Sequence, residues 1–242
     1  MSEMQYKTEE YVVVFIDILG ATKKIIKEQE RSLSIVHVAY NQALEVHKKL
    51  YGDENSVLSM PEVKIFSDNI VIATKSSTRG VETAFWSAVV FAALIQIQFL
   101  MKGYLVRGGM TIGDYFIDDT MVWGQALVRA HVLESSVAIY PRIVIDPKTV
   151  GVLHLAEPTQ QSHWICEDKD GLFFIDYIQR VMLEDKKLYP ALLDRFAEQC
   201  DDFYDEAGED VKIIQKINWH VSYLTSKVDL KELGGSDGVE NA

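Results

Sequence analysis

The segment that most constrains this fold is the apolar stretch from Ala84 to Leu100. Only Ser87, Gln96 and Gln98 interrupt it. Such a stretch is at the short end of what can span a bilayer, whereas a helix that is apolar on every side is also typical of a protein interior. We therefore predict a core helix over Gly80–Met101, which needs other elements to cover it.

The segments before this helix predict a sheet. The run Tyr11–Ile18 is rich in β-branched residues, as is typical of a strand buried on both faces. Over Ala21–Leu50 the apolar residues recur at three- and four-residue steps, which predicts a helix. Val63–Phe66 and Ile70–Thr74 predict two short strands joined as a hairpin.

Leu105–Ile112 returns to a strand pattern, so the predicted order is β-α-β-β-α-β. This is the ferredoxin-like arrangement of the α+β class, an antiparallel sheet backed by two helices. In that fold the apolar helix has a sheet to lie on.

Shorter elements are expected in the rest of the chain. They are a helix over Gly124–Val137, strands over Arg142–Ile145, His163–Cys166 and Leu172–Ile175, and helices over Leu188–Phe203 and Val211–Ser226. We predict a core over residues 1–150, a C-terminal α/β extension over 151–230 packed on that core, and a flexible tail over 231–242.

The net charge of the chain restricts the kinds of ligand that it can bind. The formal net charge is −12, so the chain repels phosphate backbones and we expect no nucleic-acid binding. A phosphate-bearing ligand would need metal ions to neutralise its site.

The only cysteines, Cys166 and Cys200, lie in no metal-binding spacing, and Met1–Glu10 is polar without a hydrophobic signal region. We expect a cytoplasmic protein that does not enter a membrane.

Asp17 is an unusual residue in this pattern, because it interrupts an apolar run. A carboxylate buried there alone would be costly unless it were paired or bound to a metal. Asp68 lies at the tip of the predicted hairpin, which in a ferredoxin-like sheet is beside the end of the first strand. Two converging carboxylates repel each other, and divalent cations, magnesium or manganese for oxygen ligands, relieve that repulsion. A solvent-facing or capping Asp17 and a turn-forming Asp68 are the simpler alternatives.

Four segments, in order, resemble the signatures of class III adenylate and guanylate cyclases. Phe15-Ile16-Asp17-Ile18-Leu19-Gly20-Ala21-Thr22 resembles Phe-x-Asp-Ile-x-Gly-Phe-Thr, and Lys64-Ile65-Phe66-Ser67-Asp68 resembles Lys-x-x-Gly-Asp with serine for glycine. Arg107-Gly108-Gly109-Met110-Thr111-Ile112-Gly113 is similar to the Arg-x-Gly-Ile-x-x-Gly strand, and Trp123-Gly124 opens the helix that follows in that family. The matches cover residues 11–137, a little over half of the chain.

The resemblance implies roles for these positions. Asp17 and Asp68 would each ligate two divalent cations, Mn²⁺ or Mg²⁺, and the backbone carbonyl of Ile18 would complete one coordination shell. Phe15 would lie close to a nucleoside triphosphate. Gly20 would begin a helix whose amides receive phosphate oxygens.

Base recognition departs from the family pattern. Purine cyclases have a base-reading aspartate two residues before the Trp-Gly pair, where this chain has Met121. Lys64 occupies the family's base-selecting lysine position without that acidic partner, which puts adenine recognition in doubt.

The transition-state positions depart as well. The asparagine and arginine of the family fall on Val128 and Val132, neither of which can stabilise charge. Gln125 and Arg129 offer an amide and a guanidinium at i and i+4, one turn earlier on one helix face. We predict Gln125 as a substrate contact and Arg129 as the group that stabilises phosphate charge.

Together the features look like the stand-alone pyrimidine cyclases of bacterial Pycsar anti-phage systems. The resemblance implies a homodimer with sites at its interface. It also implies conversion of UTP, or CTP, to a cyclic monophosphate that activates a separate effector protein. Three alternatives stay open: a purine cyclase of bacterial signalling, another two-metal palm such as a diguanylate cyclase, and a catalytically degenerate dimeric sensor.

Overall fold

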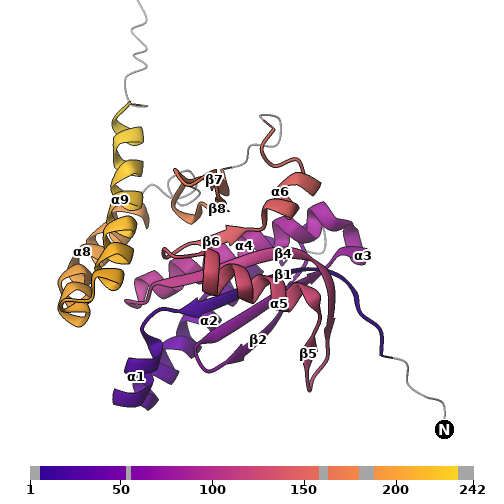
Figure 1. Ribbon diagram of the computed structural model, residues 1–242, viewed down its shortest axis with the longest axis horizontal. Helices are drawn as coiled ribbons and strands as arrows, with labels where there is room; N and C mark the ends of the chain where they lie inside the picture. Colours follow the sequence, from indigo (N-terminus) through magenta and orange to yellow (C-terminus); the bar gives the residue numbers. More distant parts are fainter. Residues whose placement is uncertain (1–5, 53–55, 158–162, 180–187, 234–242) are drawn as a thin grey trace, which may run out of the picture. The chain divides into compact units, whose positions relative to one another are not determined.

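The computed structural model describes residues 6–52, 56–157, 163–179 and 188–233 (Figure 1). The chain divides into two compact units, Met1–Tyr177 and Ile178–Ala242. The first contains all of the positions that the sequence singles out as a candidate site.

A mixed sheet forms the centre of the first unit. Its strands are β1 Glu9–Ile18, β2 Glu62–Phe66, β3 Asn69–Lys75, β4 Val106–Ile117, β5 Val122–Trp123, β6 Ile143–Ile145, β7 Ile165–Glu167 and β8 Phe173–Ile175. In the described residues they form one 8-stranded sheet in the order β2-β3-β1-β4-β6-β8-β7, with β5 paired to β4. β1 is antiparallel to both β3 and β4, and β4 is parallel to β6. Because β1 has a strand on each side, both of its neighbours can bring side chains to its end.

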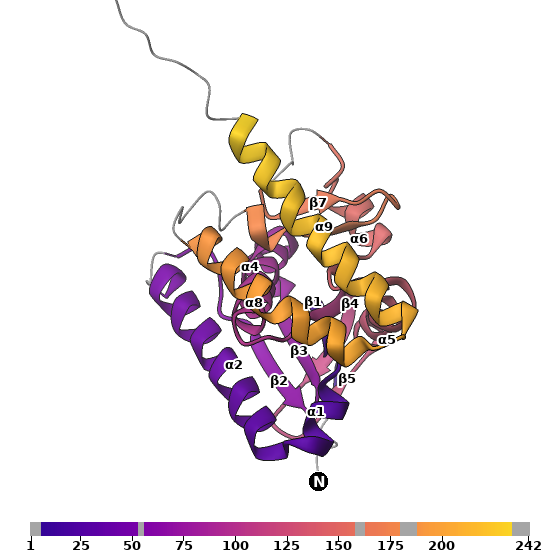
Figure 2. The ribbon, with the colours of Figure 1, turned by 90° about the vertical axis from the view of Figure 1, so that its left-hand side faces the viewer.

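Helices α4 and α5 of this unit cover the sheet (Figures 1 and 2). The helical segments of the unit include α1 Ala21–Lys27, α2 Gln29–Tyr51, α3 Ser76–Arg79, α4 Val81–Met101, α5 Gln125–Val132, the π-helical turn η1 Leu133–Val137 and α6 Pro147–Val152. α4 packs on β1 and β3 and against α2, while α5 packs on β4 and β1.

The predicted β-α-β-β-α-β order is confirmed in β1, α1 with α2, β2, β3, α4 and β4. Two details differ from the prediction. The helix expected over 21–50 is interrupted at Glu28, whose backbone leaves the helical region at φ −143° and ψ 57°. The strand expected over 105–112 continues to Ile117, because β5 pairs with its far end through Phe116 and Ile117.

α4 is a core helix, as predicted. It is long and apolar enough to cross a membrane by length and composition, but most of it is buried inside the protein. Its buried Ser87 is satisfied locally, since the hydroxyl donates to the carbonyl of Thr83 at 2.8 Å and accepts from the amide of Ser59 at 3.0 Å. Internal hydrogen bonds therefore explain one of the polar interruptions in this apolar stretch.

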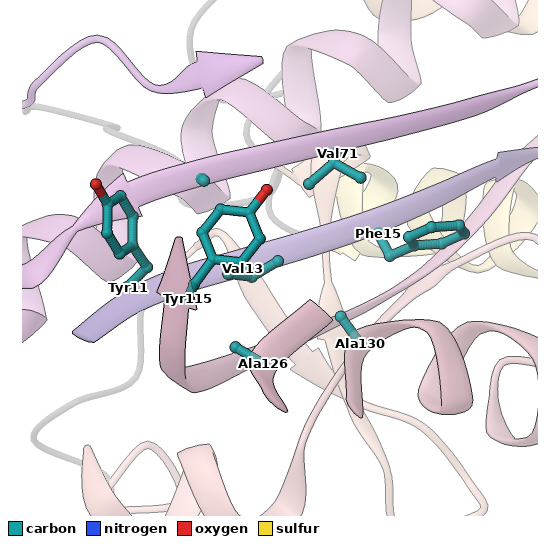
Figure 3. Close-up of a cluster of buried hydrophobic side chains, with 8 residues drawn as sticks. Tyr11, Val13, Phe15, Val71, Tyr115, Ala126 and Ala130 are labelled. Carbon is teal, nitrogen blue, oxygen red and sulfur yellow. The ribbon is translucent and has the colours of Figure 1, made fainter. Parts of the chain in front are cut away.

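The opposite face of the sheet carries alternate residues of β1 (Figure 3). A buried cluster there consists of Tyr11, Val13, Phe15, Val71, Ala73, Tyr115, Ala126 and Ala130. Close approach of α5 depends on Gly109 of β4, because a Cβ at that position would lie 2.4 Å from the carbonyl oxygen of Ala130 and 2.4 Å from the Cβ of Leu133. A glycine thus sets how near α5 and η1 come to the strands.

The C-terminal strands β7 and β8 belong to the same sheet, and the first compact unit, which ends at Tyr177, includes them. Val144 of β6 pairs with Phe174 of β8, and the buried guanidinium of Arg142 forms ion pairs with Asp168 and Asp170 beside these strands. Pairing and a buried charge cluster tie residues 163–177 to the core.

The second unit contains α8 Leu188–Ala207 and α9 Val211–Leu233. The hydroxyl of Tyr189 donates to the carbonyl of Leu224 at 3.0 Å, and Gly208 lies between the helices at φ 54°. Both predicted helices are confirmed. The packing of an extension on the core stays a prediction. Of the predicted tail, residues 231–233 are helical and 234–242 lie outside the described residues.

Candidate functional site

Asp17 lies at the end of β1 on the face that carries Phe15. In the sheet register it is opposite Asn69 of β3 on one side and Arg107 of β4 on the other. Its side chain is 21% exposed. The carboxylate is therefore neither buried in the core nor free in solvent, and the neighbouring strands decide what it contacts.

Asp68 occupies the tip of the β2–β3 hairpin, and one backbone hydrogen bond joins it to β1. The amide of Ile18 donates to the carbonyl oxygen of Asp68 at 2.9 Å. The carboxylate of Asp68 accepts from the hydroxyl of Thr22 at 3.1 Å and from the side-chain amide of Asn69 at 3.1 Å. The three predicted metal-binding positions, Asp17, Ile18 and Asp68, thus lie at one corner of the sheet.

Ser67 gives the hairpin tip its geometry. Its φ is 56°, in the left-handed region that glycine adopts without cost and other residues adopt with strain. The cyclase signature that this segment resembles has glycine here. Glycine would suit this conformation, and this chain adopts it with a serine.

Arg107 is the residue at this corner to which the sequence analysis assigned no role. Its Nε donates to Oδ2 of Asp17 at 3.2 Å, and its Nη2 lies 2.7 Å from Oε1 of Glu134. Glu134, in η1, is 3% exposed, and its other carboxylate oxygen is 3.4 Å from Nδ1 of His131. Arg107 opens the third matched segment and is opposite Asp17 in register, so strand pairing was the signal that could have identified it.

Arg129 is bound to a different carboxylate. Its Nε and Nη2 donate to the two oxygens of Asp146 at 2.7 and 2.9 Å. Asp146 is buried, accepts from the hydroxyl of Thr111 at 3.0 Å, and caps α6 through the amide of Lys148 at 3.2 Å. Burial raises the pKa of Asp146, but these hydrogen bonds outweigh burial and hold its pKa below the usual range. In this structure the guanidinium of Arg129 is a partner of Asp146, and its role toward phosphate stays a prediction.

Gln125 and Arg129 share the wall of a cavity of about 840 Å³ on the outer side of α5. The cavity is lined by Thr8, Asp114, Val122, Trp123, Gly124, Gln125, Leu127, Val128, Arg129 and Val132. Asp17 and Asp68 are not among these described lining residues. The structure therefore groups the predicted metal ligands in one place and the predicted substrate contacts of α5 in another.

Lys64 reaches the turn between β4 and β5, which also contains Met121. Lys64 pairs with Val71 of β3, which places it on the same face as Phe15, and its Nζ lies 3.5 Å from the carbonyl oxygen of Asp119. The amide of Met121 donates to Oδ1 of Asp118 at 2.8 Å. The lysine predicted to select a base is thus held by a main-chain carbonyl of the turn that carries Met121.

An aromatic group lies beside the corner. The ring of Phe15 is 4.9 Å from that of His131 and 6.2 Å from that of Phe66, measured between centroids. Phe15 is buried whereas Phe66 is 45% exposed. Phe15, a predicted substrate contact, therefore has an exposed aromatic neighbour over the same strand ends.

The donor set at the corner fits hard divalent cations. Two carboxylates and a main-chain carbonyl supply only oxygen, which magnesium and manganese prefer. Within the described part of the chain, no group of three or more His, Cys, Asp or Glu side chains is arranged to hold a metal. Asp17 and Asp68 could therefore hold cations only together with oxygens of the main chain, of water or of a ligand.

Gly20 begins α1 as expected. It adopts φ 73° immediately before the helix, and the first turn of α1 contains no acidic residue. Thr22, in that first turn, contacts the carboxylate of Asp68. The start of α1 is thus part of the same corner as the two aspartates.

No protein-family model and no curated protein match this chain. Solved structures similar to it include the adenylyl cyclase CyaB from P. aeruginosa, with 19% identity over 71% of this chain and 96% of that chain at a TM-score of 0.49. The guanylate cyclase domain of RhGC from Catenaria anguillulae, in complex with GTP, is 17% identical over 71% and 98% at 0.47. An adenylate/guanylate cyclase/hydrolase from Silicibacter pomeroyi is 13% identical over 71% and 96% at 0.46. Since these TM-scores are below 0.5, we rest the functional proposal on the residues of the site.

Proposed function

We propose that this chain is a nucleotide cyclase in which Asp17 and Asp68 bind two divalent cations, Mn²⁺ or Mg²⁺, together with a nucleoside triphosphate. The observation that carries the proposal is the hydrogen bond from the amide of Ile18 to the carbonyl of Asp68, which brings both aspartates to one corner of the sheet. Oxygen donors at this corner, in a chain of net charge −12, suit a ligand that arrives with metal ions.

Two cations bound there would favour attack of the ribose 3′-oxygen and neutralise charge on the pyrophosphate that leaves. The chain's own residues do the rest. Asp17, Asp68 and the carbonyl of Ile18 would bind and orient the cations. Thr22 and Asn69 donate hydrogen bonds to the carboxylate of Asp68 and fix its rotamer. Arg107, which is held by the buried Glu134, places a permanent positive charge next to Asp17, where a guanidinium would bind a phosphate oxygen of the substrate.

The proposed substrate is a pyrimidine nucleotide, UTP or CTP. The side chain of Met121 lacks the carboxylate that reads the base in purine cyclases, and Lys64 contacts a carbonyl of the β4–β5 turn. The cyclic monophosphate would act in the cytoplasm as a messenger of anti-phage defence and reach its effector by diffusion.

A homodimer is part of this proposal. Trp123, Val128 and Val132 are 68%, 64% and 40% exposed and lie along the cavity outside α5. Apolar side chains gathered in this way mark surfaces that bind a partner. A second subunit on this face would bring the α5 of one subunit toward the corner of the other.

One observation favours a second candidate, a degenerate cyclase fold that acts as a dimeric sensor. Val128 and Val132 are apolar at the positions where the family has its transition-state groups, and Arg129 is engaged by Asp146. A purine cyclase, another of the alternatives, would need a base-reading group in place of Met121.

The test is to incubate the purified protein with ATP, GTP, CTP or UTP and manganese and to identify products by mass spectrometry. We expect cyclic UMP or cyclic CMP from the wild type and none from a folded Asp68→Asn variant. A cyclic purine product would retain the mechanism and replace the substrate. If no triphosphate is cyclised, the sensor becomes the better proposal.

A further inference from the structure

We infer that Arg107, held in place by Glu134, is an internal counter-ion of Asp17 that a divalent cation must displace. Arg107 then lowers the affinity of the corner for metal before a nucleotide is present. The inference rests on the proposed function, because it concerns how a proposed metal ligand is held in the free protein.

The first step is the bridge that Arg107 makes between two carboxylates. One edge of its guanidinium, Nε, donates to Oδ2 of Asp17 at 3.2 Å, and Nη2 lies 2.7 Å from Oε1 of Glu134. Arg107 is on β4, Asp17 on β1 and Glu134 on η1. Three separate elements therefore fix a single guanidinium against the carboxylate that is proposed to bind metal.

The second step is the burial of Glu134. Its side chain is 3% exposed, and a carboxylate removed from water to that extent requires a charged or hydrogen-bonding partner. Arg107 and His131 lie beside its two oxygens. Since the helix that carries Glu134 sits closely on Gly109, Glu134 cannot move away without repacking α5 and η1. Glu134 is thus a positioning residue for Arg107.

The third step is electrostatic. A guanidinium in contact with Asp17 repels a cation that approaches the same carboxylate, and this repulsion is strong at distances of a few ångström in a partly buried site. Asp68 differs from Asp17 in this respect. Its carboxylate accepts from the neutral groups of Thr22 and Asn69, and in the described residues no cationic side chain forms an ion pair with it. The two proposed ligands are therefore unequal before nucleotide binds.

The experiment is calorimetric titration of the nucleotide-free, full-length protein with Mn²⁺. Removing the guanidinium in Arg107→Gln should tighten Mn²⁺ binding about tenfold, because one charge at contact distance is lost. Glu134→Gln removes one of the two carboxylates that contact Arg107 and leaves Asp17 as the other. The affinity for Mn²⁺ should therefore fall severalfold. The control is Arg79→Gln, which removes the same charge from α3, beyond the other end of β3, and should change the affinity by less than about twofold.

Because Arg107→Gln leaves Glu134 buried without its cation, a second variant protects the test against misfolding. Arg107→Gln combined with Glu134→Gln retains the net charge of the wild type and should still bind Mn²⁺ more tightly than the wild type. Affinity that is unchanged or weaker in both folded variants would overturn the inference, as would equal tightening in Arg79→Gln.

An Asp17→Asn variant separates this inference from the proposed function. If Asp17→Asn binds Mn²⁺ as well as the wild type does, the proposed metal site is wrong and the inference fails with it. If Asp17→Asn loses Mn²⁺ binding while the Arg107 variants gain none, only the counter-ion role of Arg107 is overturned.

Discussion

Two regions of the first unit each pair an arginine with a carboxylate, and they differ in what surrounds the pair. At the strand-end corner, Arg107 contacts Asp17 where three strands and η1 meet, and the carboxylate keeps part of its surface in solvent. On the outer side of α5, Arg129 is half exposed while its partner Asp146 is buried and caps a helix. A partly exposed carboxylate whose arginine is anchored by the buried Glu134 suits exchange of partners, whereas a buried carboxylate paired with a half-exposed arginine stabilises the fold.

The largest expected effect is loss of catalysis in Asp68→Asn. Removing one of two metal-binding carboxylates should lower turnover by about a thousandfold or more, as losses of transition-state charge stabilisation commonly do. Cyclic-nucleotide formation measures it, with Asp201→Asn on α8 as a matched control. A folded Asp68→Asn protein with unaltered turnover would contradict the catalytic role of the corner.

Gly109→Ala should weaken the packing of α5 and η1 on β4. Its Cβ would meet the carbonyl of Ala130 and the Cβ of Leu133 at 2.4 Å, so α5 and η1 must shift. We expect about 3 kcal/mol of destabilisation in urea unfolding, a typical cost of overpacking. Gly151→Ala is the control, since nothing lies within 4 Å of a Cβ there and its stability should be equal or higher. Equal stabilities of the two variants would show that the sheet does not require glycine at 109.

Arg129→Met should reduce stability by about 2 kcal/mol, a value below that for a fully buried pair because the arginine is half exposed. The pKa of Asp146 is depressed in the folded protein, so the pair stabilises the fold above the unfolded pKa and loses that contribution as the pH falls through the folded pKa. The difference in free energy of unfolding between wild type and variant should therefore be larger at pH 7 than at pH 3, as measured by urea unfolding.

The same variant tests the predicted catalytic role of Arg129. A loss of turnover above about tenfold in folded Arg129→Met, roughly 1.4 kcal/mol of barrier, would support a role toward phosphate. A smaller loss would leave Arg129 with its contact to Asp146 alone and would sharpen the contrast with Arg107.

The smallest expected effect is a gain of about 1 kcal/mol in Ser67→Gly, since Ser67 has φ 56° and glycine adopts that region freely. Thermal unfolding measures it. Ser77→Gly, in the helical backbone of α3, is the matched control and should lose stability. If both variants change stability in the same direction, the strain assigned to the hairpin tip is absent.

Much of the fold could be predicted because it depends on local periodicity. Three elements can be predicted from their own residues alone: the apolar helix α4, the strand β1 and the hairpin around Asp68. The placement of Asp17 and Asp68 at one corner of the sheet also followed, because the order of elements leaves few ways to pair three strands. The interruption of the first helix at Glu28 did not follow, since nothing in the apolar spacing marks it.

The sequence did not predict which charged groups contact one another. Arg107 and Arg129 each follow a valine and precede a glycine or alanine, and nothing local distinguishes one that contacts Asp17 from one that contacts Asp146. The spacing of apolar residues predicted the β-α-β-β-α-β order and the two aspartates, because hydrophobic burial acts through spacing along the chain. Only the tertiary structure decided which carboxylate each arginine meets and how near α5 comes to the sheet, because those depend on strand register and on the space that Gly109 leaves.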